Sequence, residues 1–484
     1  MKHVAIIGGG ITGLAAAFYL RQYAQTPLQI TLLESAPRLG GKIATLREDG
    51  FVVEGGPDSF ITQKTAAITL CRELGLGEAL VGSNSTAKAT YVWNRKRLHP
   101  LPEGMMLMAP TMVLPFLRSS LISWPGKLRM GMEMFLPARE EVSDESLASF
   151  VRRRLGSEAL EKIAAPLMAG IFAADPEKLS LQSTFPMFLN MEKEHGSLMR
   201  GMLRKKRTKP HIPDSPGPKP LPPPMFMTLR GGLQQLVDEL VTHLHRETML
   251  VNRRVLHVVR ERNQYKITLD DGSRLWAHQV IFATPANVTA NLVRDIDPVL
   301  AMKLRAIRYV STATVSLGFH AVDIPMPLHG SGFLVPHGEK RRITACSWSS
   351  KKFNHRAPED RELIRVFIGG ARAQQLAEQS DAALIDLARQ ELCVTMGITA
   401  PPVLARAYRW PLANPQYDVG HQTRMAEIDK LVVWHHGLHL AGAAYRGAGI
   451  PDCIQSGSKA AMTVAMDLAA SDIANQEIRI PVSV

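Results

Sequence analysis

Residues 2–20 read KHVAIIGGGITGLAAAFYL, and this stretch decides the fold of the chain around it. The run from Val4 to Ile7 is apolar and β-branched, which is typical of a buried parallel strand. It stops at three consecutive glycines, and an alanine-rich helical pattern follows them directly. Gly8, Gly10 and Gly13 match the G-x-G-x-x-G pattern of dinucleotide-binding folds. The stretch therefore predicts a strand, a glycine turn and a helix that bind a dinucleotide.

Each glycine of this pattern has a separate physical task. The first permits a tight turn, the second lets phosphates approach bare backbone, and the third lets the helix pack on the strand. The N-terminus of the helix offers unpaired N–H groups to the anion. A second apolar strand, Gln29 to Leu33, ends at Glu34, which is placed to bind a ribose 2′-hydroxyl. The alternative is a glycine-rich turn in another kind of α/β domain; the strand, the helix and the acid together favour the dinucleotide site.

Length and charge limit the classes of protein that fit. A chain of 484 residues is too long for one hydrophobic core, so we expect two or three domains. A net charge of +13 suggests a nucleic acid, an anionic membrane or a polycarboxylate as partner. No basic helix or zinc-ligand pattern supports nucleic acid. Residues 200–224 hold seven Lys or Arg against one Asp among many prolines, so we expect a mobile surface loop there that weakens any link from net charge to the active site.

The cysteines and the first residues indicate the compartment. Cys71, Cys346, Cys393 and Cys453 are scattered and form no C-x-x-C pair, which is typical of a reduced protein without structural metal. The first strand begins at residue 4 and leaves no room for a signal peptide. We therefore expect a cytoplasmic protein.

Two further glycine turns follow the ribose acid. The run from Ser35 to Lys42 contains Arg38 and Gly41, which would supply a second set of phosphate contacts. A short strand then breaks into EGGPDSF at 54–60, where backbone could approach a flavin ring closely. For Arg38 alone, an ordinary polar turn is a fair alternative.

GGGITGL, RLGGKI and EGGPDSF together resemble the flavin amine oxidase superfamily. Within it, the pattern is most similar to the protoporphyrinogen and coproporphyrinogen oxidases of the Gram-positive type. Further matching segments lie along the chain, so the resemblance covers nearly all residues: AGIFAADPEKLSLQSTFP at 169–186, ITACSWSSKKF at 343–353, RWPLANPQYDVGH at 409–421 and GAGIPDCIQSG at 447–457.

The resemblance implies an α/β fold with a discontinuous, Rossmann-like FAD-binding domain. An inserted α+β substrate domain and a mostly helical subdomain complete the expected architecture. We predict the FAD domain at 1–60, 225–288 and 418–471, the substrate domain at 61–68, 182–224 and 289–417, and the helical subdomain at 69–181.

The resemblance also implies the activity. FAD would oxidise coproporphyrinogen III to coproporphyrin III by six electrons, with three O2 consumed and three H2O2 formed, in haem biosynthesis. Flavin N5 would accept hydride, so no catalytic side chain and no metal is expected. The product would be handed to a downstream haem-pathway enzyme. A protoporphyrinogen IX oxidase is the first alternative, and a flavin amine oxidase or desaturase the second. The region 409–421 holds no cysteine to attach a flavin, so the FAD should be non-covalent.

The predicted site residues follow from these motifs and from what the resemblance implies. The helix that starts at Ile450-Pro451-Asp452 would direct its positive end at the flavin pyrimidine ring. The expected cofactor contacts are Gly8, Gly9, Gly10, Ile11, Thr12, Gly13, Glu34, Ser35, Arg38, Gly41, Lys42, Gly56, Pro57, Asp58, Ser59, Val255, Trp410, Ile450, Pro451 and Asp452. The expected substrate contacts are Lys64 for a carboxylate and Gly170, Ile171 and Phe172 for an apolar wall; a solvated helix position is the plain alternative for Lys64.

Two stretches have a pattern typical of helices. Ile61 to Leu80 reads as one helix, and we expect further helices from about residue 99 to Pro186. Within the latter, Gly104 to Leu117 is uncharged and methionine-rich but shorter than the roughly twenty residues that span a bilayer. The sequence leaves two alternatives open for it: a buried helical subdomain, or a peripheral contact with a membrane surface.

Overall fold

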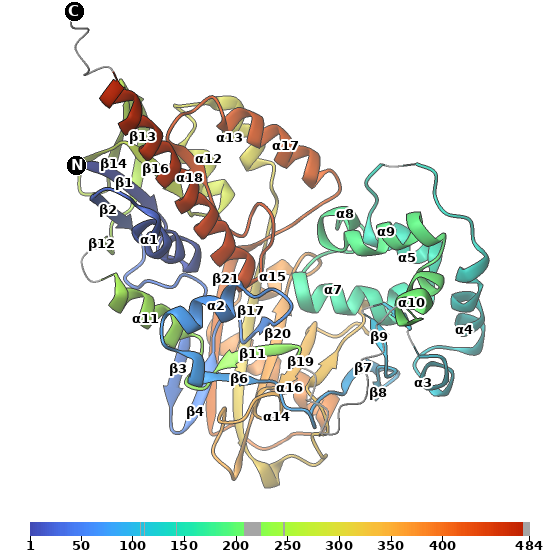
Figure 1. Cartoon of the computed structure of the whole chain (residues 1–484). Helices are drawn as coiled ribbons and strands as arrows, with labels where there is room; N and C mark the ends of the chain where they lie inside the picture. Colours follow the sequence, from blue (N-terminus) through green and yellow to red (C-terminus); the bar gives the residue numbers. More distant parts are fainter. Residues whose placement is uncertain (107, 111, 142, 208–223, 245–246, 478–484) are drawn as a thin grey trace, which may run out of the picture.

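The computed structural model describes residues 1–477 except 107, 111, 142, 208–223 and 245–246. Figure 1 shows three parts: a sheet with long helices that unites the two ends of the chain, a large second sheet, and a group of helices to one side. Chain segments far apart in sequence lie together in the first two parts.

The first part is a five-stranded parallel sheet in the order β12-β2-β1-β16-β22. Its central strand β1 is buried because both faces are covered, which explains the continuous apolar run. The strands are Lys2–Ile7 (β1), Leu28–Leu33 (β2), Thr248–Leu250 (β12), Gln279–Phe282 (β16) and Leu438–Leu440 (β22). The α/β class and the discontinuous dinucleotide sheet predicted from the sequence are confirmed.

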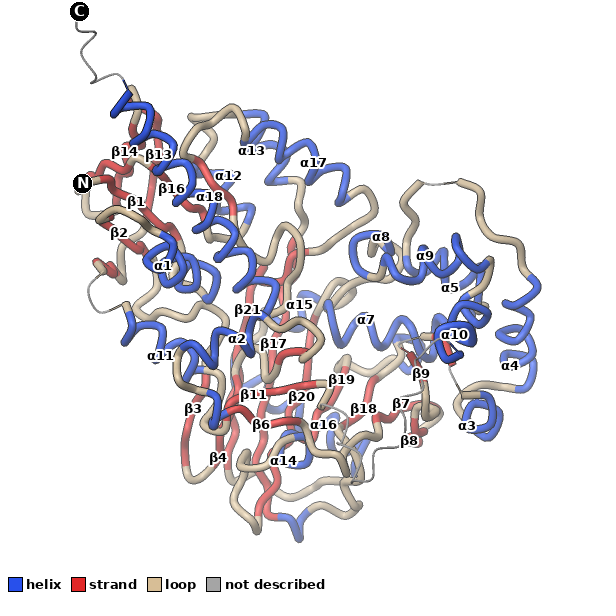
Figure 2. The backbone as a smooth tube through the Cα atoms, in the orientation of Figure 1, coloured by secondary structure: helices blue, strands red, loops and turns tan. Residues whose placement is uncertain are grey.

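Two helices that begin at glycine turns pack against each other beside this sheet. They are α1 (Ile11–Tyr23) and α18 (Ile450–Glu477), and Figure 2 shows them side by side. A Cβ on Gly457 would lie 2.3 Å from the carbonyl oxygen of Thr12, so only glycine permits this approach. The two ends of the chain are thus joined at the helices that follow the two glycine turns.

The second sheet has seven strands in the order β21-β17-β20-β19-β18-β7-β8. One face packs on α16 (Asp381–Met396) through an apolar cluster that includes Val315 and Val366. The other face turns toward the glycine turns, as the contacts below establish. The strands are Leu404–Pro415 (β21), Tyr309–His320 (β17), Arg361–Gly369 (β20), Ala345–Trp348 (β19), Gly332–Leu334 (β18), Thr90–Asn94 (β7) and Arg97–Pro100 (β8).

The third part is helical and surrounds its own apolar cluster. At its centre Glu133 and Arg154, both without exposed surface, form an ion pair. Its elements are α3 (Val113–Arg118), α4 (Trp124–Gly131), η2 (Met132–Phe135), α5 (Leu147–Arg154), α6 (Ser157–Ala159), η3 (Leu160–Ala164), α7 (Ala165–Phe172), α8 (Leu181–Thr184), α9 (Pro186–His195) and α10 (Leu198–Arg207).

Smaller strands complete the fold. A β-ribbon of three strands contains a hairpin turn at Gly272, where φ is +80°. These elements are β3 (Thr45–Glu48), β4 (Phe51–Glu54), β5 (Phe60–Ile61), β6 (Leu80–Gly82), β9 (Met105–Met106), β10 (Ala109–Pro110), β11 (Phe226–Leu229), β13 (Val255–Glu261), β14 (Gln264–Leu269) and β15 (Arg274–Ala277), with helices α2 (Ala66–Glu73), α11 (Gln234–His243), α12 (Ala286–Leu292), α13 (Pro298–Arg305) and α17 (His421–Val432).

Three local expectations were wrong. The predicted helix 61–80 is interrupted: β5 ends at Ile61, α2 covers only 66–73, and β6 follows at 80–82 because these ends pair with β11. The run after residue 99 begins with short strands rather than helices, since Pro110 and Gly104 favour a turn. Residues 200–207 of the predicted loop belong to α10, and 208–223 lie outside the described residues.

The predicted domain boundaries stay a prediction. The strands of the first sheet all come from within 1–60, 225–288 and 418–471. No helix within the described residues is long and apolar enough to cross a bilayer.

Candidate functional site

The first glycine turn is shaped to leave one side open. Gly8 has a φ of +111°, and a Cβ there would lie 2.7 Å from the carbonyl oxygen of Ala283. A Cβ on Gly13 would lie 1.9 Å from the carbonyl oxygen of Gly8, so strand and helix meet without a side chain between them. Around Gly10, by contrast, no described atom lies within 4 Å of the Cβ position. The turn is therefore closed toward the protein and open where phosphates would lie.

The N-terminus of α1 is free of side-chain caps within the described chain. Its first turn, which includes Ile11 and Thr12, contains no acid. The backbone N–H groups and the helix dipole are thus available to an anion.

Glu34 is held rigidly at the end of β2. Its Oε2 accepts a hydrogen bond from the N–H of Gly9 at 2.7 Å, and its Oε1 accepts one from the N–H of Ala36 at 2.8 Å. The Ser35 hydroxyl donates to the same carboxylate at 3.3 Å. The acid is thereby joined to the glycine turn, as a ribose ligand beside a pyrophosphate requires.

The second glycine turn lies against the first. The N–H of Gly40 donates to the carbonyl of Gly9 at 2.8 Å, and a Cβ on Gly41 would lie 3.1 Å from the Cα of Gly10. Arg38 is exposed, and its guanidinium donates to the carbonyls of Gly41 at 2.6 Å and Ile43 at 2.8 Å. In this structure Arg38 braces its own turn.

Lys42 turns inward rather than toward solvent. Its Nζ donates to the carbonyl of Ala413, and burial lowers the pKa of the amine, with Cys453 nearby as a smaller opposing influence. The carbonyl of Lys42 lies 1.7 Å from the position of a Cβ on Gly56. The second turn therefore contacts the third as closely as it contacts the first.

The third turn is held from the large sheet. The carbonyl oxygen of Gly55 accepts hydrogen bonds from Thr314 Oγ1 at 2.8 Å and Trp410 Nε1 at 2.9 Å. Arg365 donates to the same oxygen at 3.3 Å and also to the carbonyl of Gly56. Trp410, predicted from the sequence to contact the cofactor, thus lies at the turn.

The polar end of the third turn is internally paired. Asp58, which follows Pro57, forms an ion pair of 2.9 Å with Lys352 and accepts a hydrogen bond from the Ser59 hydroxyl at 2.6 Å. Burial acts to raise the pKa of Asp58, but Lys352 and Arg365 outweigh it and hold the pKa below the ordinary range. Asp58 is therefore ionised and engaged with protein groups.

The N-terminus of α18 brings a predicted cofactor residue together with a predicted substrate residue. The Nζ of Lys64 lies 2.6 Å from Oδ1 of Asp452, which belongs to the first turn of α18 together with Ile450 and Pro451. Gly447, with a φ of +149°, makes room for this carboxylate, since a Cβ there would lie 2.3 Å from its Cγ. Lys64 is half exposed, while Asp452 is largely covered.

A row of side chains crosses the face of the large sheet that turns toward the glycine turns. Residues directly opposite in an antiparallel pair share a face, so Thr314, Phe367, Ala345 and Leu334 lie on one side. Since Thr314 binds the Gly55 carbonyl, this is the side of the third turn. Phe367 is only half buried.

The predicted apolar wall lies at the other end of this row. A Cβ on Gly170 of α7 would lie 3.1 Å from Leu334, so α7 stands over the same face. Ile171 is exposed. The ring of Phe172 packs edge-on against Phe185 at 5.8 Å, so it supports the helical part rather than presenting itself freely.

Val255 lies near the ribose acid. It opens β13, and two residues earlier the N–H of Arg253 donates to the carbonyl of Glu34 at 2.9 Å. The structure therefore gathers the predicted cofactor residues around three contiguous turns and the start of α18.

Sequence reasoning missed Arg365, Lys352 and Thr314, which hold the third turn. A signal existed for the first of them: Arg365 is a charge within the apolar strand RELIRVFIG, flanked by Ile364 and Val366 that face the core. A charge at a buried strand position needs specific partners, which here are backbone carbonyls.

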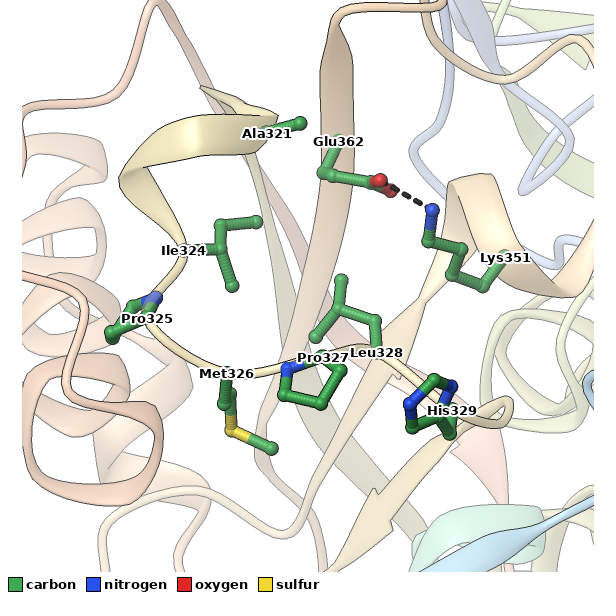
Figure 3. A pocket seen from close by; sticks show the side chains of 9 residues that line it. All are labelled: Ala321, Ile324, Pro325, Met326, Pro327, Leu328, His329, Lys351 and Glu362. Carbon is green, nitrogen blue, oxygen red and sulfur yellow. Dashed lines mark ion pairs between the residues drawn. The ribbon is translucent and has the colours of Figure 1, made fainter.

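A hollow of about 490 Å³ lies elsewhere, at the far end of β17 (Figure 3). Its wall is the segment 324–329 together with the ion pair of Lys351 and Glu362, 2.5 Å apart. The third turn binds Thr314, at the middle of the same strand, and none of the residues that line the hollow belongs to a glycine turn. This hollow is separate from the glycine turns.

The glycine turns fit FAD. The open side of Gly10, the uncapped N-terminus of α1 and the fixed Glu34 carboxylate match the pyrophosphate and ribose of an adenine dinucleotide. The family model described as flavin containing amine oxidoreductase matches residues 11–465. The chain belongs to this family. It is an FAD-dependent oxidoreductase.

Members of the family with known names match over nearly the full length. Coproporphyrinogen III oxidase of Bacillus subtilis (strain 168) is 38% identical over 96% of this chain and 98% of its own length. Protoporphyrinogen oxidase of Homo sapiens is 32% identical over 96% of this chain and 98% of its own. A crystal structure from Exiguobacterium sp. 255-15, assigned to the protoporphyrinogen oxidases, matches with a TM-score of 0.85 and 32% identity over 96% of this chain and 99% of that one. The predicted resemblance is confirmed.

Proposed function

We propose that this enzyme oxidises coproporphyrinogen III to coproporphyrin III. Six electrons leave the substrate, three O2 are consumed and three H2O2 are formed. The observation that carries the proposal is the full-length similarity to the Bacillus subtilis enzyme of that name. When bound, FAD supplies the hydride acceptor.

The chain's own residues then have the tasks of binding and orientation. The row from Phe367 to Leu334 offers an apolar strip between the third turn and α7, which suits a flat macrocycle. Lys64, half exposed beside α18, offers an ammonium to a substrate carboxylate. Because Asp452 already binds Lys64, a substrate carboxylate must compete for this ammonium.

The cofactor roles predicted from the sequence remain part of the proposal. Gly8–Gly13 and Gly41 bind the pyrophosphate, Glu34 the ribose, Val255 the adenine side, and the third turn and α18 the flavin side. The distances among the three turns support this assignment, because each turn touches the next.

Steady-state rates on two porphyrinogens test the substrate. We expect a higher kcat/KM for coproporphyrinogen III than for protoporphyrinogen IX, because a tetracarboxylate has more groups for basic side chains. A higher value for protoporphyrinogen IX would make the first alternative correct. Absence of porphyrin fluorescence with both substrates in air, with turnover of an amine, would establish an amine oxidase instead.

We further propose that the protein works in the cytoplasm and touches the membrane surface through α4 and η2. Along these elements Trp124, Leu128, Met132 and Phe135 are exposed by 68, 71, 50 and 81% at helical spacing. Between residues 103 and 140 the only acidic residue is Glu133, which is fully buried, whereas several basic residues occur. An apolar stripe without exposed acid suits an anionic lipid surface.

Sedimentation with anionic vesicles tests this contact. Changing Trp124, Leu128 and Phe135 to serine should abolish sedimentation with the vesicles. The matched control changes Val322 and Trp434, exposed apolar residues elsewhere, and should leave it intact. Equal sedimentation of both variants would refute the contact.

A further inference from the structure

The carbonyl oxygen of Gly55 is the meeting point of three strands. It accepts hydrogen bonds from Thr314 of β17, Trp410 of β21 and Arg365 of β20, at 2.8, 2.9 and 3.3 Å. A carbonyl oxygen has two lone pairs, so three donors leave it little freedom to move. The third turn is therefore fixed to the sheet at a single atom.

Of the three donors, Arg365 is the one whose burial costs free energy, because it carries a charge. Its residue is 3% exposed, its guanidinium also donates to the carbonyl of Gly56, and its Cζ lies 4.9 Å from the ring centre of Phe367. Burial lowers the pKa of Arg365, while the nearby Asp58 and Glu54 act against this. A buried charge needs paired hydrogen bonds to be tolerated, and here the partners include the backbone of the turn.

The other charges around the turn have their own partners. Lys352 pairs with Asp58 at 2.9 Å, and Arg356 lies 3.5 Å from Glu54 and donates to Thr228 at 2.6 Å. Of the described cations near the turn, Arg365 is thus distinguished by hydrogen bonds to the two glycine carbonyls.

A shift of the third turn would reach the pyrophosphate turn. A Cβ on Gly56 would lie 1.7 Å from the carbonyl oxygen of Lys42. A Cβ on Gly41 would lie 3.1 Å from the Cα of Gly10. Contacts between backbone atoms cannot be relieved by a side-chain rotamer. The three turns must therefore move together.

We propose that Arg365 is a positioning residue for FAD: with Thr314 and Trp410 it holds the Gly55–Gly56 peptide where the cofactor site requires it. The inference rests on the FAD site and not on which porphyrinogen is oxidised. Charge-assisted hydrogen bonds to a buried carbonyl are strong, so their loss should be measurable in cofactor affinity.

The test uses the holoenzyme and compares Arg365→Met with Arg365→Lys. FAD release, followed by flavin fluorescence, should show an affinity about 10- to 100-fold weaker for the Met variant. The Lys variant should recover part of this loss, because an ammonium can reach one of the two carbonyls. The visible absorption bands of the remaining bound flavin should shift in the Met variant, while KM for the porphyrinogen stays unchanged.

Arg406→Gln is the matched control. Arg406 faces Ser316, as Arg365 does from the other side, but its side chain is 43% exposed and paired with Glu48. It should leave FAD affinity and the flavin spectrum unchanged. Thr314→Val removes one donor to the Gly55 carbonyl with little change of shape and should weaken FAD binding by about threefold. If Arg365→Met does not fold, Thr314→Val tests the proposal in its place.

Three results would overturn the proposal. The first is wild-type FAD affinity and spectrum in Arg365→Met or, if that variant does not fold, in Thr314→Val. The second is a raised KM for the porphyrinogen with unchanged FAD affinity, which would make Arg365 a substrate contact. The third is an equal effect of Arg406→Gln. The first and the third need no substrate, so they are separate from failure of the proposed activity.

Discussion

The parallel sheet contains two strand–glycine–helix units: the first unit is β1 with α1, and the second unit is β22 with α18. The N-termini of their helices differ in charge. At α1 the turn is open at Gly10 and the first helical turn has no acid. At α18 the first helical turn contains Asp452, which is paired with Lys64 at 2.6 Å. An open N-terminus attracts a full anion such as a pyrophosphate, whereas a carboxylate in the first turn offsets the same partial charge. Asp452 thus makes the difference between the two helix ends. The N-terminus of α1 suits an anion, whereas that of α18 suits a neutral ring with partial charge.

Giving the first unit an acid should have the largest effect. Gly10 is the N-cap with a φ of −72°, so Gly10→Asp introduces no backbone strain. A like charge near the pyrophosphate costs about 4 kcal/mol at close range, so FAD affinity should fall by at least about 100-fold. Asp is also a good N-cap, so the Tm of the apoprotein should stay within about 2 °C.

Gly13→Ala is the contrasting control for this prediction. Its Cβ would lie 1.9 Å from the carbonyl oxygen of Gly8, so both FAD affinity and the apoprotein Tm should fall. Calorimetry and FAD titration separate the two variants. Retention of FAD by Gly10→Asp would show that the open turn is not the anion site.

In the second unit, the strand β22 makes the stability of the protein depend on pH. Burial lowers the pKa of His439 on β22 to about 4 from 6.5, and its Nε2 lies 2.7 Å from Oε1 of Gln279. A depressed histidine pKa means that the unfolded chain binds the proton first; the stabilisation is complete above pH 6.5 and is lost as pH falls toward 4. Between pH 7 and pH 5 the protein should lose about 1–2 kcal/mol through this residue.

Chemical unfolding at pH 7 and pH 5 checks this. His439→Gln should lose less stability than wild type over that interval. His320 at the end of β17, whose side chain is 45% exposed, is the control, and His320→Gln should follow the wild-type curve. Parallel curves for His439→Gln and wild type would contradict the prediction.

Removing the acid of the second unit should have a smaller effect. Asp452→Asn leaves the N-terminal partial charge of α18 without its counter-charge, which favours an anionic reduced flavin. The flavin midpoint potential should rise by on the order of 20 mV. A spectroscopic redox titration measures it, and a fall would place the helix end away from the flavin.

Lys64→Met should change the flavin midpoint potential in the opposite direction to Asp452→Asn. The change should be of similar or smaller size, since Lys64 is half exposed. The potential should fall slightly, and KM for coproporphyrinogen III should rise about threefold or more if the ammonium binds a carboxylate. The double variant with Asp452→Asn should return the potential close to wild type but keep the raised KM. A normal KM in both variants would remove Lys64 from the substrate site.

The sequence predicted what depends on local backbone geometry. Gly8, Gly13 and Gly56 were recognisable because only glycine permits such close approach of backbone to backbone. The pair of Lys64 and Asp452 could not be found in this way, since the two residues are 388 positions apart.

That Thr314, Arg365 and Trp410 all donate to the Gly55 carbonyl could not be read from the sequence either. Which side chains face that oxygen depends on the register of β17, β20 and β21, and register is a tertiary property. Arg38 shows the same limit: its residue type predicts a phosphate contact, and the hydrogen bonds that it makes to carbonyls of its own turn could not be read from the sequence. Polar side chains near an anion site are thus identified less reliably than the glycines that shape it.

The strand order β12-β2-β1-β16-β22 has a consequence for synthesis of the chain on the ribosome. Strand β1 receives its neighbour β16 only after residue 279, and the edge strand β22 and the helix α18 emerge later still. Until then the glycine turn stands beside an unfinished sheet whose open edge invites pairing with other nascent chains. Cofactor capture therefore belongs to the end of translation, and chains that terminate before residue 450 should accumulate as aggregates rather than as a smaller FAD-binding protein.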